Sequence, residues 1–342
     1  MNAPKGGMRR LLAVLGLLAL FAVACESNAP QDFLNEQAGD AAREADRLWD
    51  ITFWIAVAVF VLVEGVLVFT ILKFRQRPGR EAAQFHGNTK LEVVLTIIPS
   101  LILAGIAVPT IKTIFEAAEE PDNGLNITVV GRQFWWEYKY DDLELTTANE
   151  MHIPLGQPVV LSLQGLEEDV IHSFWIPRLT GAQDVVPTHD NSLIFTPEKT
   201  GEYLGQCKEF CGLSHANMRL KVFVDTPEEF DAWVEEQKAD AAAPTDSLAA
   251  QGEEIFLQQA CAGCHTVQGT EALGQLGPNL THLASRSTFG GAMFDLDEEN
   301  LRDWVADAPS MKPGVLMPSG TKELGLTPED VNAIVAYLQS LE

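Results

Sequence analysis

The chain has 342 residues, of which 46% are hydrophobic, and carries a formal net charge of −25 at pH 7. This length allows two or three domains, and the strong negative charge argues against nucleic acid as a partner, because phosphate backbones bind basic surfaces. Any electrostatic docking partner is therefore expected to be basic.

Residues 1–25 are predicted to be an export signal. Lys5, Arg9 and Arg10 precede the apolar run LLAVLGLLALFAVA, which is too short to span a bilayer and ends directly before Cys25. Cleavage before Cys25 would free its thiol for lipid attachment, so Cys25 is a candidate lipidation site. An ordinary buried cysteine, or one removed with the signal, is the alternative interpretation.

Two longer apolar stretches, residues 49–74 and 91–115, are each long enough to cross a membrane. The loop between them is basic, and the positive-inside rule places it in the cytoplasm. We therefore expect a transmembrane hairpin over residues 49–115 in a bacterial cytoplasmic membrane. Residues 26–48 and everything from 116 onward would lie on the exported side. The basic residues of the loop are Lys73, Arg75, Arg77, Arg80 and Lys90.

The pattern changes at residue 126 to short runs of β-branched and aromatic residues separated by turn signals such as Pro-Leu-Gly and Lys-Thr-Gly. This pattern predicts an antiparallel β-sandwich or barrel over residues 116–236. The sandwich should end with a helix in TPEEFDAWVEEQ, where Thr226 and Glu229 form a capping box. Residues 237–247 are small and polar and are expected to be a linker.

Residues 248–342 show helical patterns and are predicted to form a small all-α domain. Its last helix should begin with a capping box of Thr327 with Glu329 and Asp330. Cys261, Cys264 and His265 form CxxCH, which attaches c-type haem through two thioether bonds and supplies one axial ligand. A redox dithiol or a zinc site is the alternative for this motif.

The sixth iron ligand is expected to be a thioether if the haem transfers electrons. Met317 in GVLMPSG is favoured, while Met293 and Met311 are alternatives that would more ordinarily fill the core. The Met-Pro context, and LGPNLTHLASR with Pro278 near the ligand histidine, resemble class I cytochromes c.

A second cluster of soft ligands lies in QCKEFCGLSHANM, which contains Cys207, Cys211, His215 and Met218. The wide cysteine spacing and the methionine are untypical of a tetrahedral zinc site. Thiolate, imidazole and thioether together are the ligands of copper electron-transfer centres, and two thiolates indicate two coppers. The alternative is a histidine and two thiols that simply pack under a loop.

This segment resembles the binuclear copper site, CuA, of subunit II of haem-copper cytochrome c oxidases, and the resemblance extends over the hairpin and the sandwich. It implies a cupredoxin-like fold in which Cys207 and Cys211 bridge the coppers. His215 and Met218 would be terminal ligands, as would an upstream histidine. That histidine is His172 in DVIHSFWIP, and the backbone carbonyl of Glu209 completes the implied set.

The resemblance implies roles for further acidic residues. The Glu209 side chain would help to hold magnesium at the boundary with subunit I, and Asp169 and Asp184 match positions near that boundary. Glu92 resembles a glutamate at the mouth of a proton channel, with a helix-start carboxylate as the alternative. Glu64 lies mid-membrane and must face protein or a partner. The other histidines, expected to be surface or hydrogen-bonded residues, are His86, His152, His189 and His282.

The chain departs from the family pattern at two places. Phe134, followed by Trp135 and Trp136, stands where the family commonly has the tryptophan that receives electrons from soluble cytochrome c. A tethered cytochrome domain makes a high-affinity site for a free carrier less necessary, because the linker keeps its effective concentration high. Ala182 and Thr188 replace a lysine and a glycine that flank the Asp184 segment.

The resemblance as a whole implies the electron-input subunit of a proton-pumping oxidase with a fused cytochrome c. Electrons would come from an external donor, such as a cytochrome or the cytochrome bc complex, and pass through haem and copper to subunit I, where oxygen is reduced. Subunit III is a further expected partner, and no catalytic residue is expected in this chain. The alternatives are the CuA subunit of a nitric oxide reductase, a membrane-anchored copper chaperone or sensor, and a purely structural anchor.

Overall fold

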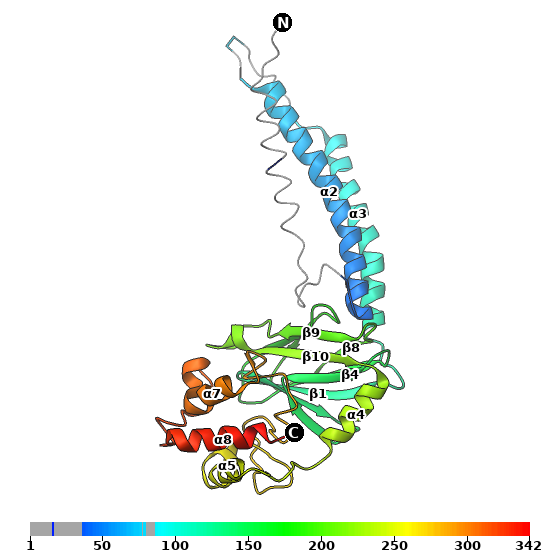
Figure 1. The fold of residues 1–342 in the computed structure, drawn as a ribbon. Coiled ribbons are helices and arrows are strands. Elements are labelled where there is room, and N and C mark those ends of the chain that lie inside the picture. Colours follow the sequence, from blue (N-terminus) through cyan, green and yellow to red (C-terminus); the bar gives the residue numbers. More distant parts are fainter. Residues whose placement is uncertain (1–15, 17–35, 77, 80–85) are drawn as a thin grey trace.

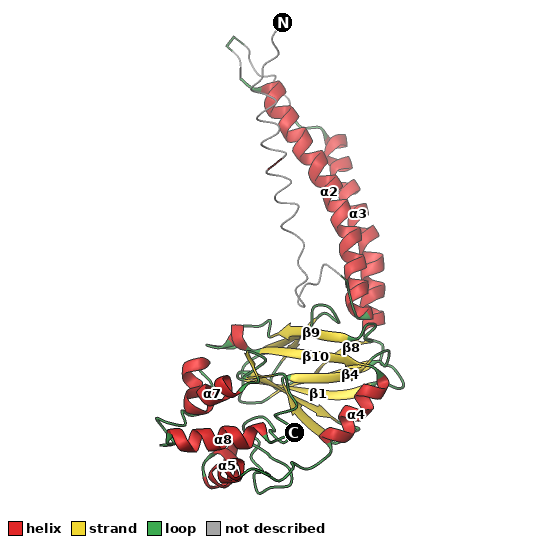
Figure 2. Ribbon diagram, viewed as in Figure 1, coloured by secondary structure: helices red, strands yellow, loops and turns green. Residues whose placement is uncertain are grey.

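The structure is a computed structural model that describes residues 16, 36–76, 78–79 and 86–342. The predicted export signal with Cys25, and Arg77 and Arg80 of the basic loop, lie outside the described residues. A long helical hairpin stands on one side of a β-sandwich, and a small helical domain packs against the opposite part of the sandwich (Figure 1, Figure 2). The order of these parts along the chain is the predicted one.

The hairpin consists of α2 (Asp40–Phe74) and α3 (Thr89–Ala117), which run side by side (Figure 1). The most apolar window of each helix has a mean hydropathy of 2.8 in α2 and 2.4 in α3, and no residue of either window is buried within the chain, as expected for helices that cross a membrane. Helix α2 starts earlier than residue 49 because its first turn is docked on the sandwich. There the backbone N–H of Thr196 donates to Asp40 Oδ1 at 2.7 Å.

The sandwich contains a five-stranded sheet in the order β3-β2-β1-β5-β8 and a three-stranded sheet in the order β4-β10-β9. A separate pair, β6-β7, lies beside them. Alternate residues of these strands point inward and are fully buried, among them Ile127, Leu161 and Phe174. The strands are β1 (Leu125–Arg132), β2 (Trp135–Tyr140), β3 (Leu145–Ala148), β4 (Glu150–Pro154), β5 (Val159–Gly165), β6 (His172–Trp175), β7 (Ala182–Val185), β8 (Asn191–Phe195), β9 (Gly201–Gln206) and β10 (Arg219–Asp225).

Two of the strand pairs are parallel, although the sequence predicted an antiparallel sandwich. Strand β1 pairs with β5 in parallel, and β10 pairs with β4 in parallel, whereas the other pairs of the two larger sheets are antiparallel. The alternation of side chains shows which face of a strand is buried but not the direction of its neighbour. The parallel pairs therefore left no signal in the sequence.

Helix α4 (Pro227–Gln237) closes the sandwich and begins with the predicted capping box of Thr226 and Glu229. Its apolar face buries Phe230 and Val234. Burial of these two side chains fixes α4 against the β-core, so the segment that leads to the last domain starts from a defined position.

The C-terminal domain is built from α5 (Ser247–Gln258), the short α6 (Cys261–Cys264), α7 (Glu298–Met311) and α8 (Pro328–Gln339). Helices α5 and α8 approach closely at Gly252, where a Cβ atom would lie 1.9 Å from the carbonyl oxygen of Ala333. The capping box of α8 uses Thr327 and Asp330, and Glu329 takes no part in it.

A small hairpin interrupts this helical domain, which the sequence did not predict. It joins β11 (Thr288–Phe289) to β12 (Phe294–Asp295). The turn contains Gly290 and Gly291, whose φ angles of 64° and 80° suit glycine. Strands of two residues are too short to show an alternating pattern.

Candidate metal centre and haem cavity

The two cysteines of the candidate metal centre lie on the loop between β9 and β10, and both are buried. Their sulfur atoms are 3.8 Å apart, and the carbonyl oxygen of Glu209 lies 3.2 Å from Cys207 Sγ. The backbone N–H of Cys207 donates to Met218 O at 2.9 Å, which closes the two ends of the loop on each other. The loop therefore holds both sulfurs and one carbonyl oxygen around a single point.

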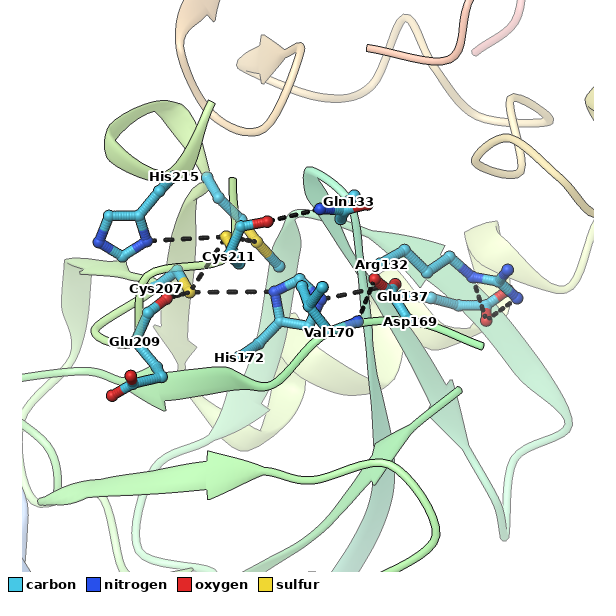
Figure 3. Close-up of polar contacts among 11 residues, drawn as sticks. Arg132, Gln133, Glu137, Asp169, Val170, His172, Cys207, Glu209, Cys211 and His215 are labelled. Atoms are coloured by element: carbon cyan, nitrogen blue, oxygen red, sulfur yellow. Dashed lines mark hydrogen bonds and ion pairs between the residues drawn. The ribbon is translucent and has the colours of Figure 1, made fainter. Parts of the chain in front are cut away.

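His172 approaches the sulfurs from another strand. It is the first residue of β6 and is fully buried, with Nδ1 4.0 Å from Cys207 Sγ (Figure 3). One ligand atom each from His172, Cys207 and Cys211 lie within 4.8 Å of one another. On the other side of the ring, Nε2 is 3.5 Å from Asp169 Oδ2. The structure thus brings His172 next to two thiols, of which the nearer in sequence, Cys207, is 35 residues away.

The other two predicted ligands lie around Cys211. His215 begins the short 3₁₀-helix η1 (His215–Asn217), and its Nδ1 is 3.6 Å from Cys211 Sγ. The buried Met218 places Sδ 3.8 Å from the same sulfur. The Glu209 carboxylate points away from the sulfurs, so only its backbone faces the centre (Figure 3). The other four predicted groups therefore surround the sulfur pair, and the complete donor set of six suits copper.

The charges of the centre favour bound cations. The hydrogen bond with Cys211 lowers the pKa of Cys207, and the same contact raises the pKa of Cys211, so the two sulfurs share one proton. Burial opposes a charge on His172, but its bonds to Asp169 and Cys207 outweigh burial and raise its pKa. Metal ions in place of the shared proton would satisfy both sulfurs at once.

Asp169 is expected to orient His172 for metal binding. Replacing it in Asp169→Asn should lower copper affinity by about 10–100-fold, because an outer carboxylate fixes the ring orientation and basicity of a ligating histidine. Competition of the full chain against a copper chelator measures this. Asp184→Asn is the matched control, since Asp184 is exposed, and it should bind copper like the unsubstituted chain. Equal affinity in both variants would contradict the role of Asp169.

The CxxCH motif opens into a cavity of about 280 Å³ within the helical domain. His265 donates from Nδ1 to the carbonyl oxygen of Pro278 at 2.9 Å, which leaves Nε2 free to face the cavity. Gly277 is required beside the ring, because a Cβ atom there would lie 2.5 Å from His265 Cε1. Burial lowers the pKa of His265, which keeps the imidazole neutral as a metal ligand must be.

The lining of this cavity suits a haem. Its polar and soft groups include Cys261, Cys264, His265 and Met317, and most of the other lining residues are apolar. Of the three candidate methionines, all in the described part of the chain, Met317 lines the cavity and Met293 and Met311 do not. The apolar lining includes Phe256, Leu280, Leu283, Phe289, Leu301, Trp304, Val305, Leu326, Ile334 and Leu338.

Met317→Leu is expected to lower the haem reduction potential and to abolish the far-red absorption of thioether-ligated ferric haem, because leucine offers the iron no ligand. Spectroelectrochemistry of the full chain tests this. Met293→Leu and Met311→Leu are volume-matched controls and should leave the band in place. If the band survives in Met317→Leu and disappears in Met293→Leu or Met311→Leu, the methionine whose replacement removes the band is the ligand.

One wall of the haem cavity comes from the β-sandwich. Gln133 and Phe134, from the turn between β1 and β2, and Trp135, the first residue of β2, line it together with residues of the helical domain. Trp136 lies elsewhere, fully buried, with its ring centroid 5.9 Å from that of His172. Of the three aromatic residues predicted for electron transfer, two therefore face the haem cavity and the third contacts the metal centre.

Two cations in the cavity wall, the half-buried Arg286 and the buried Lys312, were not predicted from the sequence. Arg286 donates from Nη2 to Asn279 O, and burial lowers its pKa to about 10. Lys312 is 1% exposed, and burial lowers its pKa to about 7. Arg286 ends the segment LGPNLTHLASR, but the resemblance of that segment to class I cytochromes c gave this arginine no role. Lys312 lies in no such segment, and a single charged residue is ordinarily taken for a surface residue.

The remaining predicted residues lie apart from both sites. His152 stacks between Phe223 and Trp233 and places Nδ1 2.7 Å from Asp225, and His282 is hydrogen-bonded through Nε2 to Ala239 O. His86 and His189 are exposed. These environments agree with the expectation of surface or hydrogen-bonded histidines.

The two acidic residues of the hairpin that the sequence singled out, Glu64 and Glu92, belong to neither sandwich site. Glu92 Oε1 accepts the backbone N–H of Asn88 at 3.2 Å, and the Asn88 side chain accepts that of Leu91. Glu92 thus caps the start of α3, as its helix-start interpretation requires. Glu64 is exposed on α2.

Comparisons with known proteins cover nearly the whole chain. Residues 27–113 match the cytochrome c oxidase subunit II transmembrane domain, residues 143–224 its periplasmic domain, and residues 249–342 cytochrome c. The cytochrome c oxidase subunit 2 of Alkalihalophilus pseudofirmus is 36% identical over 96% of both chains. The chain belongs to the cytochrome c oxidase subunit II family. Subunits 2 of Bacillus sp. strain PS3 and Bacillus subtilis are 35% and 31% identical over 97% of this chain, and over 97% and 98% of their own lengths.

Membership in the subunit II family confirms several predictions. The chain is a membrane protein with two transmembrane helices, a periplasmic cupredoxin-like domain and a C-terminal cytochrome c domain. The cytochrome c domain implies haem c, and the His/Cys/Met cluster of the periplasmic domain implies CuA copper. As part of an oxidase complex, the chain transfers electrons to subunit I. The nitric oxide reductase, chaperone and anchor interpretations are thereby set aside.

Proposed function

We propose that the chain takes electrons from an external donor onto a haem held by Cys261, Cys264, His265 and Met317, and passes them through a copper pair to subunit I. The copper pair would be held by His172 and the loop from Cys207 to Met218. Two coppers that share one electron across two thiolates change geometry little on reduction, so they supply fast transfer at small driving force. The chain itself positions both centres and shields them from water.

One observation carries this proposal: the two candidate sites share a wall. Gln133 and Phe134 line the haem cavity, and Gln133 Nε2 donates to the carbonyl oxygen of the copper-loop residue Cys211. A single side chain thus reaches from the haem cavity to the copper loop. This proximity lets an electron move within one chain rather than between two diffusing proteins.

The position of Phe134 supports electron input through the cytochrome c domain. Phe134 is 5% exposed, because the helical domain covers the place where a free carrier would otherwise dock. A soluble donor therefore cannot reach this residue, and the external donor, a cytochrome or the cytochrome bc complex, would deliver electrons to the haem instead. The acidic net charge would attract a basic donor.

The exposed side of the copper loop is the proposed contact with subunit I. Glu209, Phe210 and Leu213 are exposed there, and apolar side chains in such positions mark a protein interface. The exposed Glu209 carboxylate is free to help hold magnesium at that contact, with the exposed Asp184 on β7 near the same boundary. Asp169 is committed to His172. Subunit III is a further proposed partner in the complex.

The proposed topology places the N-terminus and both electron-transfer domains on the exported face of a bacterial cytoplasmic membrane, with the basic loop between α2 and α3 in the cytoplasm. Glu92, which caps the start of α3, would then lie at the cytoplasmic end of that helix. That is the end at which a proton channel would open. Cys25 is a proposed lipidation site.

Rapid mixing of the complete oxidase with a reduced donor cytochrome tests the proposed order of transfer. Haem c should be reduced first, at a rate proportional to donor concentration. The copper pair should follow at a rate that does not depend on donor concentration, because the second step is internal. Reduction of copper before haem, or in proportion to the donor, would contradict the proposal.

A further inference from the structure

Lys312 is an unusual residue for a protein interior. It lies in the loop between α7 and Met317, is 1% exposed, and donates from Nζ to the carbonyl oxygens of Phe134 and Gly290, each at 2.7 Å. The charges that act on it most are those of Cys211 and Arg219, and no carboxylate of the described residues pairs with it. A buried ammonium is costly without an anionic partner. Its position therefore calls for an explanation beyond packing.

The surroundings of Lys312 are shaped to hold its ammonium. A Cβ atom on Gly291 would lie 2.5 Å from Nζ, and Gly291 adopts a φ of 80°, which suits glycine. The carbonyl oxygen of Gly291 in turn accepts the backbone N–H of Arg219 on β10 of the sandwich at 3.1 Å. The ammonium is thus enclosed at the junction of the two domains.

Lys312 completes a continuous series of bonds between the haem cavity and the copper loop. Its ammonium binds Phe134 O, the peptide bond links Phe134 to Gln133, and Gln133 Nε2 donates to Cys211 O. Lys312 and Gln133 both line the haem cavity, and Cys211 supplies one of the two sulfurs. Figure 3 shows Gln133 reaching the copper loop at Cys211.

A second contact joins the same two loops. Ser214 donates from Oγ to the carbonyl oxygen of Pro313, the residue after Lys312. A Cβ atom on Gly314 would lie 3.0 Å from Leu213 Cβ, so the loops touch directly. The loop that carries Met317 is therefore held against the loop that carries Cys211. Lys312 adds a contact from the Met317 loop to Phe134 O through its ammonium.

A separate clamp joins the helical domain to the sandwich just before Gly290, at Ser287 and Thr288. The buried Glu150 of β4 accepts hydrogen bonds from the backbone and hydroxyl groups of Ser287 and Thr288. These bonds hold the domain on the sandwich without Lys312. Loss of Lys312 should therefore disturb the path between the two sites while the domain stays docked.

We propose that Lys312 is a positioning residue for electron transfer from the haem to the copper pair. By binding Phe134 O it fixes the distance and orientation of the Met317 loop relative to Gln133 and Cys211. This inference rests on the proposed function, in which the electron crosses this junction.

The test is flash reduction of the haem in the complete oxidase by a photoexcited ruthenium complex, followed by the absorbance of haem and copper. Lys312→Met, which removes the ammonium but keeps the chain length, should slow internal transfer by about tenfold or more, because small displacements of a reacting pair have large effects on rate. The haem spectrum and the copper resonance signal should be unchanged. Lys312→Arg should restore part of the rate.

Two further variants separate positioning from folding. Lys322→Met is the matched control, since Lys322 is an exposed lysine of the same domain that pairs with Asp307, and it should transfer at the unsubstituted rate. Gln133→Leu breaks the contact with Cys211 while leaving Lys312 in place and should also slow transfer. A normal rate in Lys312→Met would overturn the role of Lys312, whatever the rate in Gln133→Leu. Absence of transfer in the unsubstituted oxidase would instead overturn the proposed function.

Discussion

Replacing Cys207 with serine should abolish the binuclear copper signal and reduce oxygen consumption by the complete oxidase to background. Cys207 Sγ lies 3.8 Å from Cys211 Sγ and also contacts His172 and the Glu209 carbonyl oxygen. It is therefore next to three of the other proposed copper ligands. A serine hydroxyl is a hard, weakly acidic ligand that does not replace a bridging thiolate. Paramagnetic resonance and copper analysis of the same preparation measure the loss.

Lys208→Ala is the control for this variant. Lys208 is the exposed neighbour of Cys207. Among the described residues, its ammonium lies over the ring of Trp175 and contacts no proposed copper ligand. The variant keeps both thiolates and should keep the signal and the activity. A Cys207→Ser oxidase that retains two coppers with a shared electron would show that Cys207 does not bridge them.

The double variant Cys261→Ala/Cys264→Ala should lose covalent haem and lose turnover with an external cytochrome donor. Without the thioether bonds, acidified organic solvent should extract all haem from the chain. Phe134 is covered by the helical domain, so the copper pair offers no alternative docking site to the donor. The copper resonance signal should remain, because the metal centre lies in the other domain.

Gly263→Ala provides the matched control between the two cysteines. A Cβ atom at Gly263 would meet nothing within 4 Å, so this variant should keep its haem and its turnover. Full turnover of the double variant with the same donor would show that electrons reach copper without the attached haem, and would contradict the proposed route.

The local motifs were the parts of this molecule that the sequence predicted best. In CxxCH the attachment cysteines and the iron ligand are neighbours, so no knowledge of the fold is needed to group them. The same holds for the segment from Cys207 to Met218, which forms one loop. The two apolar helices were predictable because lipid imposes length and composition on a single segment.

Pairings between distant segments were harder to predict. His172 was placed in the copper set only through a family resemblance, and the structure gives the physical reason in β6, which points this side chain at Cys207. The role of Asp169 behind His172 has no local signature. Helix α2 begins at Asp40, before its apolar part, because Asp40 is hydrogen-bonded to Thr196 of the sandwich. Hydropathy alone does not predict this earlier start.

The contact between the two exported domains had no signal in the sequence. The residues next to Glu150 and Lys312 in the sequence do not mark either one as an interface residue. Both charged side chains are nevertheless buried where the domains meet. Their partners are mainly backbone carbonyls, backbone N–H groups and hydroxyls, which almost any sequence provides. Only the three-dimensional arrangement shows that the haem cavity and the copper loop share a boundary.

We propose that this one chain holds two different electron-transfer centres side by side. Metal and haem analysis combined with paramagnetic resonance of the purified full chain, matured with haem and copper, tests it most directly. We expect one covalent haem and two coppers that share a single unpaired electron delocalised over both nuclei. A single copper with its own localised electron, or zinc at the two cysteines, would contradict the account.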